Sequence, residues 1–335
     1  MKRKPFRMTF NLALFLIWVV IFLFIGFRSP YFFKPTYLIS TMLRNIVEIG
    51  MVALPMTMII LTGGIDLSVG NILVLSCMLG GMAAAASGSS AAGIAVIMLV
   101  GLVCGLINGI VITKAKIPPM ITTLSTMYLY LGLARGLSQG NSVYSFPAAA
   151  WMGNTIIGSY KDPVQLPVQI IFYVVLAVIF VIVVQRSTYG RKLFAIGLNE
   201  NAVRYSGIDT DKIKIIAYTV CGLVCAFASI IWLGRFTSVK YDAGTSFNLK
   251  VITVVVLGGT SINGGVGDMK GTLLATLIIA TLNSGLTVMN IPIDAQTIIQ
   301  GVVLLISLIA FSIASQRARQ RKVIKVVSEN TPEQQ

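Results

Sequence analysis

The chain is divided into long apolar runs separated by short polar segments. Crossing about 30 Å of hydrocarbon takes roughly 20 apolar residues in a helix that rises about 1.5 Å per residue. Suitable runs occur at 11–27, 46–62, 71–87, 91–112, 119–136, 166–185, 213–234, 250–263, 271–289 and 296–314, of which 250–263 is the shortest and weakest. The sequence therefore predicts an all-α, polytopic membrane protein of about ten transmembrane helices, with residues 1–335 forming one domain.

The composition and the charge pattern agree with lipid as the solvent. Only 11% of the residues are charged, against about 25% in a typical soluble domain. The net charge of +15 does not indicate a nucleic-acid partner, because the basic residues fall between the apolar runs and at the two ends. If the amino terminus lies in the cytoplasm, most of the basic residues fall on cytoplasmic segments. Both termini are therefore expected in the cytoplasm, including the basic tail 315–335.

Two further patterns concern how the spans begin and what they contain. The amino terminus resembles a secretory signal, but it lacks a small-x-small cleavage site, so 11–27 is expected to be a retained first span. Cys77, Cys104, Cys221 and Cys225 lie inside apolar runs. Cys221 and Cys225 share a helix face and could in principle bind a metal. With no histidine in the chain, small buried hydrophobic residues are the better interpretation, and no metal site is predicted.

Small residues at helical spacing and a weak internal sequence similarity indicate how the spans pack. Gly101, Gly105 and Gly109 recur at every fourth position and form one glycine face, and Gly271 with Ala275 begins a similar face. Residues 64–81 loosely match 244–259, and residues 106–119 loosely match 282–293. These pairs fall on spans of opposite direction, as expected for an inverted repeat of the two halves.

The stretch "LTGGIDLSVGN" (61–71) places Asp66 among three glycines, Gly63, Gly64 and Gly70. A carboxylate in mid-span costs about 2.5–3.5 kcal/mol on insertion scales. The glycines break the helix, so the carboxylate is expected at an interface or in a water-lined cavity. Two roles stay open for Asp66: capping of the following helix, with Ser68 as the alternative cap, and a direct part in the solute path or its gate.

Four segments carry a family resemblance. "LTGGIDLSVGNILVLSCMLGG" (61–81) resembles the signature of permease subunits of ABC sugar importers of the ribose, galactose and xylose type, including their rhamnose and autoinducer-2 relatives. Residues 187–215, 254–278 and 282–291 are similar to further regions of that family, in the expected order. The resemblance implies a multi-pass transport subunit of the bacterial inner membrane, not an enzyme. Such a subunit passes a sugar or sugar-like solute from an extracytoplasmic binding protein into the cytoplasm.

The chain departs from that pattern in two places. Many members have an acidic pair where this chain reads Asn248-Leu249-Lys250. The change puts a carboxylate role there in doubt and would fit a different solute. The loop reads Asn201-Ala202-Val203 where two alanines are usual, a milder change that bears on the fit to a partner.

No phosphate-binding loop is present in the sequence. The segment "GGVGDMKGT" (264–272) places Lys before Gly, without the G-K-[ST] order that cradles phosphate, and indicates a tight turn. The chain is therefore expected to hold no cofactor, and ATP is expected on a separate ATPase subunit.

Residues 186–214 form the longest of the segments expected in the cytoplasm. Gly190, Gly197 and Gly207 are expected to interrupt regular structure within it. Asn199 is predicted to be the N-cap of a helix of about two turns that ends before Gly207 at the C′ position. The resemblance implies that this is the helix that couples the permease to its ATPase. The coupling candidates are Gly197, Asn199, Glu200, Ala202, Arg204, Ser206 and Gly207. A solvated basic loop held by anionic lipid headgroups is the alternative.

The solute path is expected to use polar residues at span breaks and on facing spans. The candidates are Asp66, Ser68, Asn71, Asn108, Asn283 and Ser284. An interhelical hydrogen bond is the alternative for each of them. Glu48 is expected at a polar interface.

Outside the membrane, residues 137–165, with Trp151 and Tyr160, and residues 236–247 are candidates for docking the binding protein, although aromatic residues there also serve as membrane anchors. A second permease, either a copy or a paralogue, is expected as a partner, together with membrane lipid.

Three competing functions stay open at this point. A branched-chain amino-acid ABC permease has similar spans. An ion-coupled secondary transporter usually carries acids or histidines near mid-membrane, and here there are no histidines while Glu48 and Asp66 lie near span ends. A membrane scaffold that transports nothing is the third.

Overall fold

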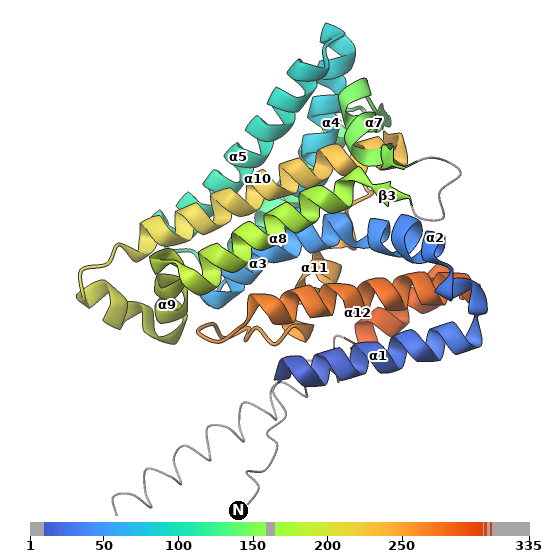
Figure 1. Cartoon of the computed structure of the whole chain (residues 1–335). Helices are drawn as coiled ribbons and strands as arrows, with labels where there is room; N and C mark the ends of the chain where they lie inside the picture. The colour runs from blue at the N-terminus through green and yellow to red at the C-terminus, as the bar shows by residue number, and fades with distance from the viewer. Residues whose placement is uncertain (1–9, 159–164, 304, 307–308, 310–335) are drawn as a thin grey trace, which may run out of the picture.

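The computed structural model describes residues 10–158, 165–303, 305–306 and 309, and its helices form a layered bundle (Figure 1). The first half contains α1 (Phe10–Arg28), α2 (Pro35–Tyr37), α3 (Val47–Leu61), α4 (Val69–Ser87), α5 (Ser90–Lys114), α6 (Pro119–Leu137) and α7 (Pro147–Asn154). The second half contains α8 (Val168–Arg186), α9 (Thr188–Tyr205), α10 (Thr210–Phe236), α11 (Phe247–Leu257) and α12 (Met269–Val288), and residues 293–303 are also helical. Short turns of 3-10 and π helix, η1 (Pro30–Phe33), η2 (Leu38–Leu43) and η3 (Arg44–Ile46), join α1 to α3.

The predicted all-α membrane fold is confirmed. Seven helical segments in the described part are long and apolar enough to cross a membrane: α1, Pro35–Leu61, α4, α5, α8, α10 and α12. The strands are two-residue pairs, β1 (Val143–Tyr144) with β4 (Ser238–Val239) and β2 (Ile156–Ile157) with β3 (Leu166–Pro167). Helix α6 occupies the predicted run 119–136, but it is less apolar than the seven.

Two of the predicted spans need comment. The run 250–263 was expected to cross the membrane, and this is wrong, because α11 has 11 residues and extends over only about 16 Å. The run 296–314 lies partly outside the described residues, and the tail 315–335 lies wholly outside them. The helix in its described part starts at residue 293.

The predicted glycine faces are contact surfaces. An added Cβ on Gly101 would lie 2.3 Å from the carbonyl oxygen of Gly222, and one on Gly105 would lie 2.4 Å from that of Tyr218. Helices α5 and α10 therefore pack backbone to backbone, as small residues allow in a membrane. Gly271 of α12 approaches Gly258 in the same way, with 1.9 Å from the added Cβ to the carbonyl oxygen. The four cysteines are free and buried.

Helices α4 and α11 begin beside each other inside the bundle. An added Cβ on Gly70 would lie 2.5 Å from the carbonyl oxygen of Gly244, and the converse distance is also 2.5 Å. The Asn248 side-chain amide donates to the carbonyl oxygen of Leu67 at 3.1 Å. The segments that echo each other in the sequence thus meet at the start of two helices, in the manner of the discontinuous helices of transporters. The inverted repeat itself stays a prediction.

The bundle has two distinct ends, which we name by the short helices that lie there (Figure 1). The α9 end carries α9, the start of α10 and the loop 258–268 between α11 and α12. The α7 end carries α7, the end of α10 and both strand pairs. Pairing of Val143 with Val239 brings the predicted docking segments 137–165 and 236–247 together at this end. Tyr160 lies outside the described residues.

Candidate coupling surface and solute route

Helix α9 contains a break at Asn199, where the backbone is extended (φ −163°, ψ 97°). The Asn199 side-chain oxygen accepts a hydrogen bond from the backbone N–H of Ala202 at 3.0 Å, which is the N-cap geometry. The predicted start of the short helix is therefore confirmed. A helix that precedes it from Thr188 was not predicted, because Gly190 and Gly197 were expected to interrupt this segment.

Gly207 ends the short helix in the left-handed conformation (φ +83°). Its N–H donates to the carbonyl oxygen of Arg204 at 3.1 Å, and the N–H of Ile208 donates to that of Val203 at 3.4 Å. These two bonds form a Schellman motif, in which glycine carries no steric penalty. The predicted C′ position of Gly207 is confirmed.

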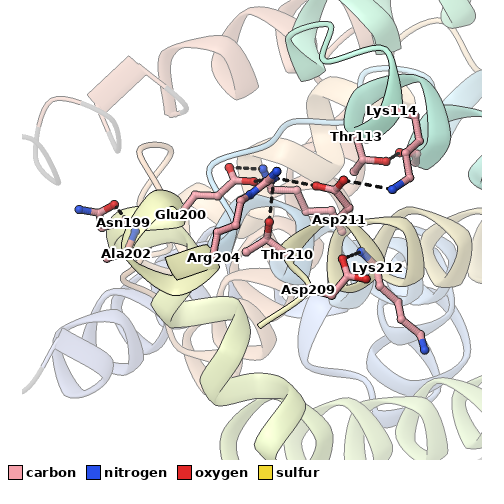
Figure 2. Close-up of polar contacts among 12 residues, drawn as sticks. Thr113, Lys114, Asn199, Glu200, Ala202, Arg204, Asp209, Thr210, Asp211 and Lys212 are labelled. Atoms are coloured by element: carbon pink, nitrogen blue, oxygen red, sulfur yellow. Dashed lines mark hydrogen bonds and ion pairs between the residues drawn. The ribbon is translucent and has the colours of Figure 1, made fainter. Parts of the chain in front are cut away.

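Charged side chains tie this short helix to the start of α10 and the end of α5 (Figure 2). Arg204 donates to Asp211 at 2.7 Å, to the Thr210 hydroxyl at 3.0 Å and to Glu200 at 3.4 Å. Lys114 donates to the other oxygen of Asp211 at 3.2 Å. The short helix and two long helices are thus joined by one polar network.

Glu200 connects the same network to a second cation, Lys214, at 2.5 Å. Partial burial alone would raise the pKa of the Glu200 carboxyl. The hydrogen bond and the positive charge of Lys214, with the charge of Arg204, outweigh this effect and lower the pKa below its ordinary value. Glu200 is therefore ionised and paired at neutral pH.

The opposite face of the short helix is open to solvent. Leu198 is 72% exposed and Tyr205 is 91% exposed, and Ala202, Ser206 and Gly207 are also exposed. Tyr205 is thus an exposed aromatic side chain on a helix with a fixed position, and tyrosine is enriched among the residues that dominate protein interfaces. Sequence analysis did not single out Leu198 or Tyr205, since an apolar residue in a polar loop gives no sign of its direction.

Gly197 does not interrupt the helical segment as predicted; it allows other backbone segments to approach closely. An added Cβ there would lie 2.0 Å from the carbonyl oxygen of Leu61 and 2.2 Å from the backbone nitrogen of Gly265. The N–H of Gly265 itself donates to Leu61 at 2.9 Å. Three backbone segments from α9, the end of α3 and the loop 258–268 thus meet at the α9 end. The loop carries the predicted tight turn, with Gly264 at φ +82° and Gly265 at φ +72°.

The glycines of the stretch 61–71 end α3 and allow close packing. Gly63 has φ +79°, and the N–H groups of Gly63 and Gly64 donate to Ile60 and Ile59, a second Schellman motif. An added Cβ on Gly64 would lie 2.6 Å from the Tyr218 hydroxyl oxygen. The predicted helix break is confirmed.

Asp66 is fully buried, with 0% of its surface exposed, so the expectation of an interface or a water-lined cavity is wrong. Its Oδ1 accepts from the Ser68 N–H at 2.8 Å and from the Ser68 hydroxyl at 2.6 Å. The Asn108 amide donates to the Ser68 hydroxyl at 2.8 Å and to Asp66 Oδ2 at 3.5 Å. The Tyr130 hydroxyl donates to Asn108 at 3.3 Å. Hydrogen bonds therefore replace water around this carboxylate.

Ser68 occupies the predicted N-cap position of α4, but the predicted side-chain cap is not formed. Helix α4 begins at Val69 with Ser68 as its N-cap residue, and the Ser68 carbonyl oxygen accepts from the N–H groups of Asn71 and Ile72, but neither the Ser68 hydroxyl nor the Asp66 carboxylate accepts a bond from the first turn of that helix. Asp66 instead fixes the turn that leads into α4.

The side chains of the remaining path candidates bond elsewhere, although the backbone N–H of Asn71 donates to the carbonyl oxygen of Ser68 at 2.9 Å. The Asn71 amide donates to the carbonyl oxygen of Met127 in α6 at 2.7 Å. Asn283 accepts from the Gln300 amide at 2.7 Å, and Ser284 is buried, with a hydroxyl that has no partner among the described residues. The structure thus brings Asp66, Ser68 and Asn108 together, and it places Asn283 and Ser284 on α12.

At the α7 end, Glu48 is 1% exposed, so its expected place at a polar interface is wrong. One nitrogen of Arg235 donates to both Glu48 oxygens, at 3.1 and 3.0 Å, and the other donates to Asn45 at 2.8 Å. Sequence analysis did not find Arg235, because its partner is 187 residues away.

Comparison with known proteins decides the family. A family model described as "Branched-chain amino acid transport system / permease component" matches residues 38–308. The chain belongs to this permease family. It is 36% identical to the ribose import permease protein RbsC of Bacillus subtilis over 305 residues, which cover 89% of this chain and 92% of that protein. No solved structure matches the chain.

Further members of the permease family match at similar levels. The autoinducer 2 import system permease protein LsrD of Photorhabdus temperata is 32% identical over 94% of this chain and 95% of its own length. RbsC of Escherichia coli K12 is 36% identical over 87% of this chain and 90% of its own length. The region that matches the permease family contains α9, the Asp66 cluster and α12. The chain is therefore a multi-pass membrane protein of a transport family.

Proposed function

We propose that this protein is the membrane-spanning permease subunit of an ATP-driven importer that moves a sugar or sugar-like solute into the cytoplasm. The observation that carries the proposal is the similarity to ribose and autoinducer 2 import permeases over at least 87% of the chain. The branched-chain amino-acid alternative is not favoured, because these relatives are ribose and autoinducer 2 permeases although the family model bears the other name.

The α9 end is proposed to face the cytoplasm and to bind the ATPase. The short helix 200–205 presents Ala202 and Tyr205 to solvent next to the exposed Leu198 that precedes it, and Arg204 with Glu200 fixes its other face to α10, whose Asp211 also pairs with Lys114 of α5. A docked ATPase that moves this helix would move both long helices and, through Gly197, the end of α3. Both termini are proposed to lie on the same cytoplasmic side, following the distribution of basic residues.

The solute route is proposed to pass the starts of α4 and α11. Gly70 in the first turn of α4 meets Gly244 just before the short helix α11, and breaks between helices inside a bundle mark solute sites in transporters. Asp66, Ser68 and Asn108 fix the turn before α4. Asn71 lies in the first turn of α4, and Asn283 lies on α12, which packs against α11. Ser284, next to Asn283, is included as a path residue.

The α7 end is proposed to dock the extracytoplasmic binding protein. It carries the paired strands β1 and β4 and the exposed Trp151. Arg135 and Lys240 line an open hollow of about 460 Å³ beside them, which gives an acidic partner surface cations to approach. A second permease, either a copy of this chain or a paralogue, completes the proposed importer.

ATP-driven uptake tests the proposal. The chain is reconstituted into liposomes with the ABC ATPase and the binding protein encoded beside its gene, and labelled sugar uptake is measured with and without internal ATP. Uptake that requires ATP, survives an ionophore and is competed by free sugars but not by leucine is expected. Uptake by the permease without any ATPase, or uptake that collapses with the ion gradient, would overturn it.

A further inference from the structure

A small cavity lies between the first half of α11, α12 and the helical residues 293–303. It has a volume of about 200 Å³, below the roughly 300–1,000 Å³ of pockets for drug-sized ligands. Its polar lining comes from Ser246, Lys250, Thr253, Thr297 and Gln300. Most of the cavity surface is nevertheless apolar and includes Leu249 and Ile279. An occupant of this cavity is therefore a small molecule that combines an apolar face with a few polar groups.

Lys250 is the only ionisable side chain that lines the cavity among the described residues. It is half-buried, and its ammonium group has no ion pair, hydrogen bond or aromatic ring contact within the described part of the chain. Helix α11 is only about 16 Å long and ends where Gly258 contacts Gly271 at the α9 end. Lys250 therefore lies within the length of the bundle and not at either face.

The position of Lys250 on its helix adds to the cost of an unpaired charge. It is the fourth residue of α11, close to the positive end of the helix dipole, where anions are favoured and cations are not. A charged side chain at membrane depth usually has a partner or a function. No carboxylate of the described residues supplies that partner.

The other lining groups fit a sugar. Ser246 makes no side-chain hydrogen bond among the described residues, so its hydroxyl is free to donate to an anion beside Lys250. The hydroxyls of Thr253 and Thr297 donate to the backbone oxygens of Leu249 and Ile293, at 2.7 and 3.0 Å. Their oxygens consequently remain as acceptors for the hydroxyls of a sugar. Donors for an anion and acceptors for hydroxyls thus line one cavity.

We propose that the cavity around Lys250 binds the acidic group of an anionic sugar, such as a sugar acid, as it passes through the permease. The inference rests on the proposed function, because an anion site of this kind serves a solute route. Lys250 binds the acidic group, Ser246 adds a hydrogen bond, and Thr253 with Thr297 receives the sugar hydroxyls. A cation in a solute route selects anions in the same way as rings of Lys or Arg in anion pores.

The experiment uses the full chain in phosphatidylcholine nanodiscs and two matched probes, D-glucuronate and D-glucose, which differ at C6. Binding is measured by equilibrium dialysis of the labelled sugars. Glucuronate is expected to bind the wild type and Lys250→Arg, and to bind Lys250→Gln about tenfold or more weakly, because a charge-assisted hydrogen bond is lost. Glucose is expected to bind all three at least tenfold more weakly than glucuronate binds the wild type. Lys34→Gln, which removes an exposed lysine elsewhere, is the control and is expected to leave binding unchanged.

A second arm separates a solute from a lipid headgroup, which offers the same anionic chemistry. Nanodiscs that contain phosphatidylglycerol are examined by native mass spectrometry. Phosphatidylglycerol retained by the wild type, lost from Lys250→Gln and competing with glucuronate would assign the cavity to lipid and overturn the proposal. No glucuronate binding to the wild type, or equal binding of glucose, would also overturn it. These measurements need no nucleotide, so their failure leaves ATP-driven uptake of a neutral sugar, and hence the proposed function, intact.

Discussion

Gly197 lies against the carbonyl oxygen of Leu61, so closely that an added Cβ would be 2.0 Å from that oxygen. This contact joins the segment proposed to bind the ATPase to the end of α3, and the next residues lead through Gly63 and Gly64 to Asp66. On the proposed function, a displacement of α9 by the ATPase would reach the turn before α4 without an intervening side chain, since backbone packs on backbone.

Gly197→Ala is expected to impair coupling. The new methyl group overlaps two backbone atoms that cannot move as a flexible side chain would, and such overpacking costs about 1–3 kcal/mol. ATP-driven uptake and the stimulation of ATPase activity by solute should fall, while the amount of protein in the membrane falls less. Gly132→Ala in α6 is the matched control, because an added Cβ there has no heavy atom within 4 Å. Equal uptake by the two variants would contradict the role of the contact.

Gly207→Pro is expected to abolish association with the ATPase while leaving membrane insertion intact. Proline cannot adopt φ +83° and has no N–H to donate to Arg204. The end of the short helix should therefore lose its Schellman motif. Co-purification with the ATPase is the measurement. Gly88→Pro imposes the same conformational defect at a distant glycine, with φ +65°, and is expected to retain the ATPase. Normal co-purification of Gly207→Pro would count against the coupling role of this helix.

Acid is expected to weaken the network around Glu200. The folded-state pKa of Glu200 lies below the unfolded value, which is about 4.3. The pairing with Lys214 and Arg204 therefore stabilises the fold fully above that unfolded value, and the stabilisation is lost as pH falls through the folded pKa. The difference in melting temperature between wild type and Glu200→Gln should stay constant from about pH 7 to 5 and shrink below about 4. A constant difference down to pH 3 would show that this carboxylate is not paired.

Local signals predicted the segments whose structure depends on near neighbours. Asn199 and Gly207 bound a short helix because a cap and a left-handed glycine act within four residues. The glycines at 101, 105 and 109 share a face because of the helical repeat. Each of these features is decided by residues close in sequence, so the sequence alone sufficed.

Features that depend on distant residues were missed. Glu48 was expected at a polar surface because its partner, Arg235, lies 187 residues away. Asp66 was expected near water because Asn108 and Tyr130, which replace the water, come from other helices. Gly197 was expected to interrupt the helical segment, because its contacts Leu61 and Gly265 are distant in sequence and only the fold brings them close. Helix α11 was expected to be a full span because hydropathy alone does not show where a helix ends inside a bundle.

Asp66→Ala and Asn108→Ala are expected to be non-additive. Removing the Asp66 carboxylate leaves the buried Ser68 hydroxyl and the Asn108 amide with fewer partners, at about 1–3 kcal/mol per unsatisfied group. Once one residue is gone, loss of the other should cost less, and residues in one network typically couple by about 0.5–3 kcal/mol. Unfolding free energies of the wild type, both single variants and the double variant give the coupling. Asp66→Asn, which keeps an acceptor, is the control for charge. Strictly additive costs would show that Asp66 and Asn108 contribute independently and do not form one hydrogen-bond network.

Glu48 and Arg235 form a buried pair whose two halves should behave differently from a surface pair. Glu48→Ala leaves the guanidinium of Arg235, 17% exposed, without its carboxylate, and breaking such a pair from one side typically costs about 3–5 kcal/mol. The double variant Glu48→Met with Arg235→Met should recover most of that loss, because two apolar residues leave no uncompensated charge. The comparison pair is Lys114 with Asp211, in which Lys114 is 62% exposed, so Lys114→Ala should cost no more than about 1 kcal/mol. Denaturant unfolding in one detergent, read by the fluorescence of Trp232 next to Phe236, measures all four proteins. A cost for Glu48→Ala no greater than for Lys114→Ala would show that the Arg235 charge is solvated by water at the α7 end. This ion pair would then not hold the start of α3 to the end of α10.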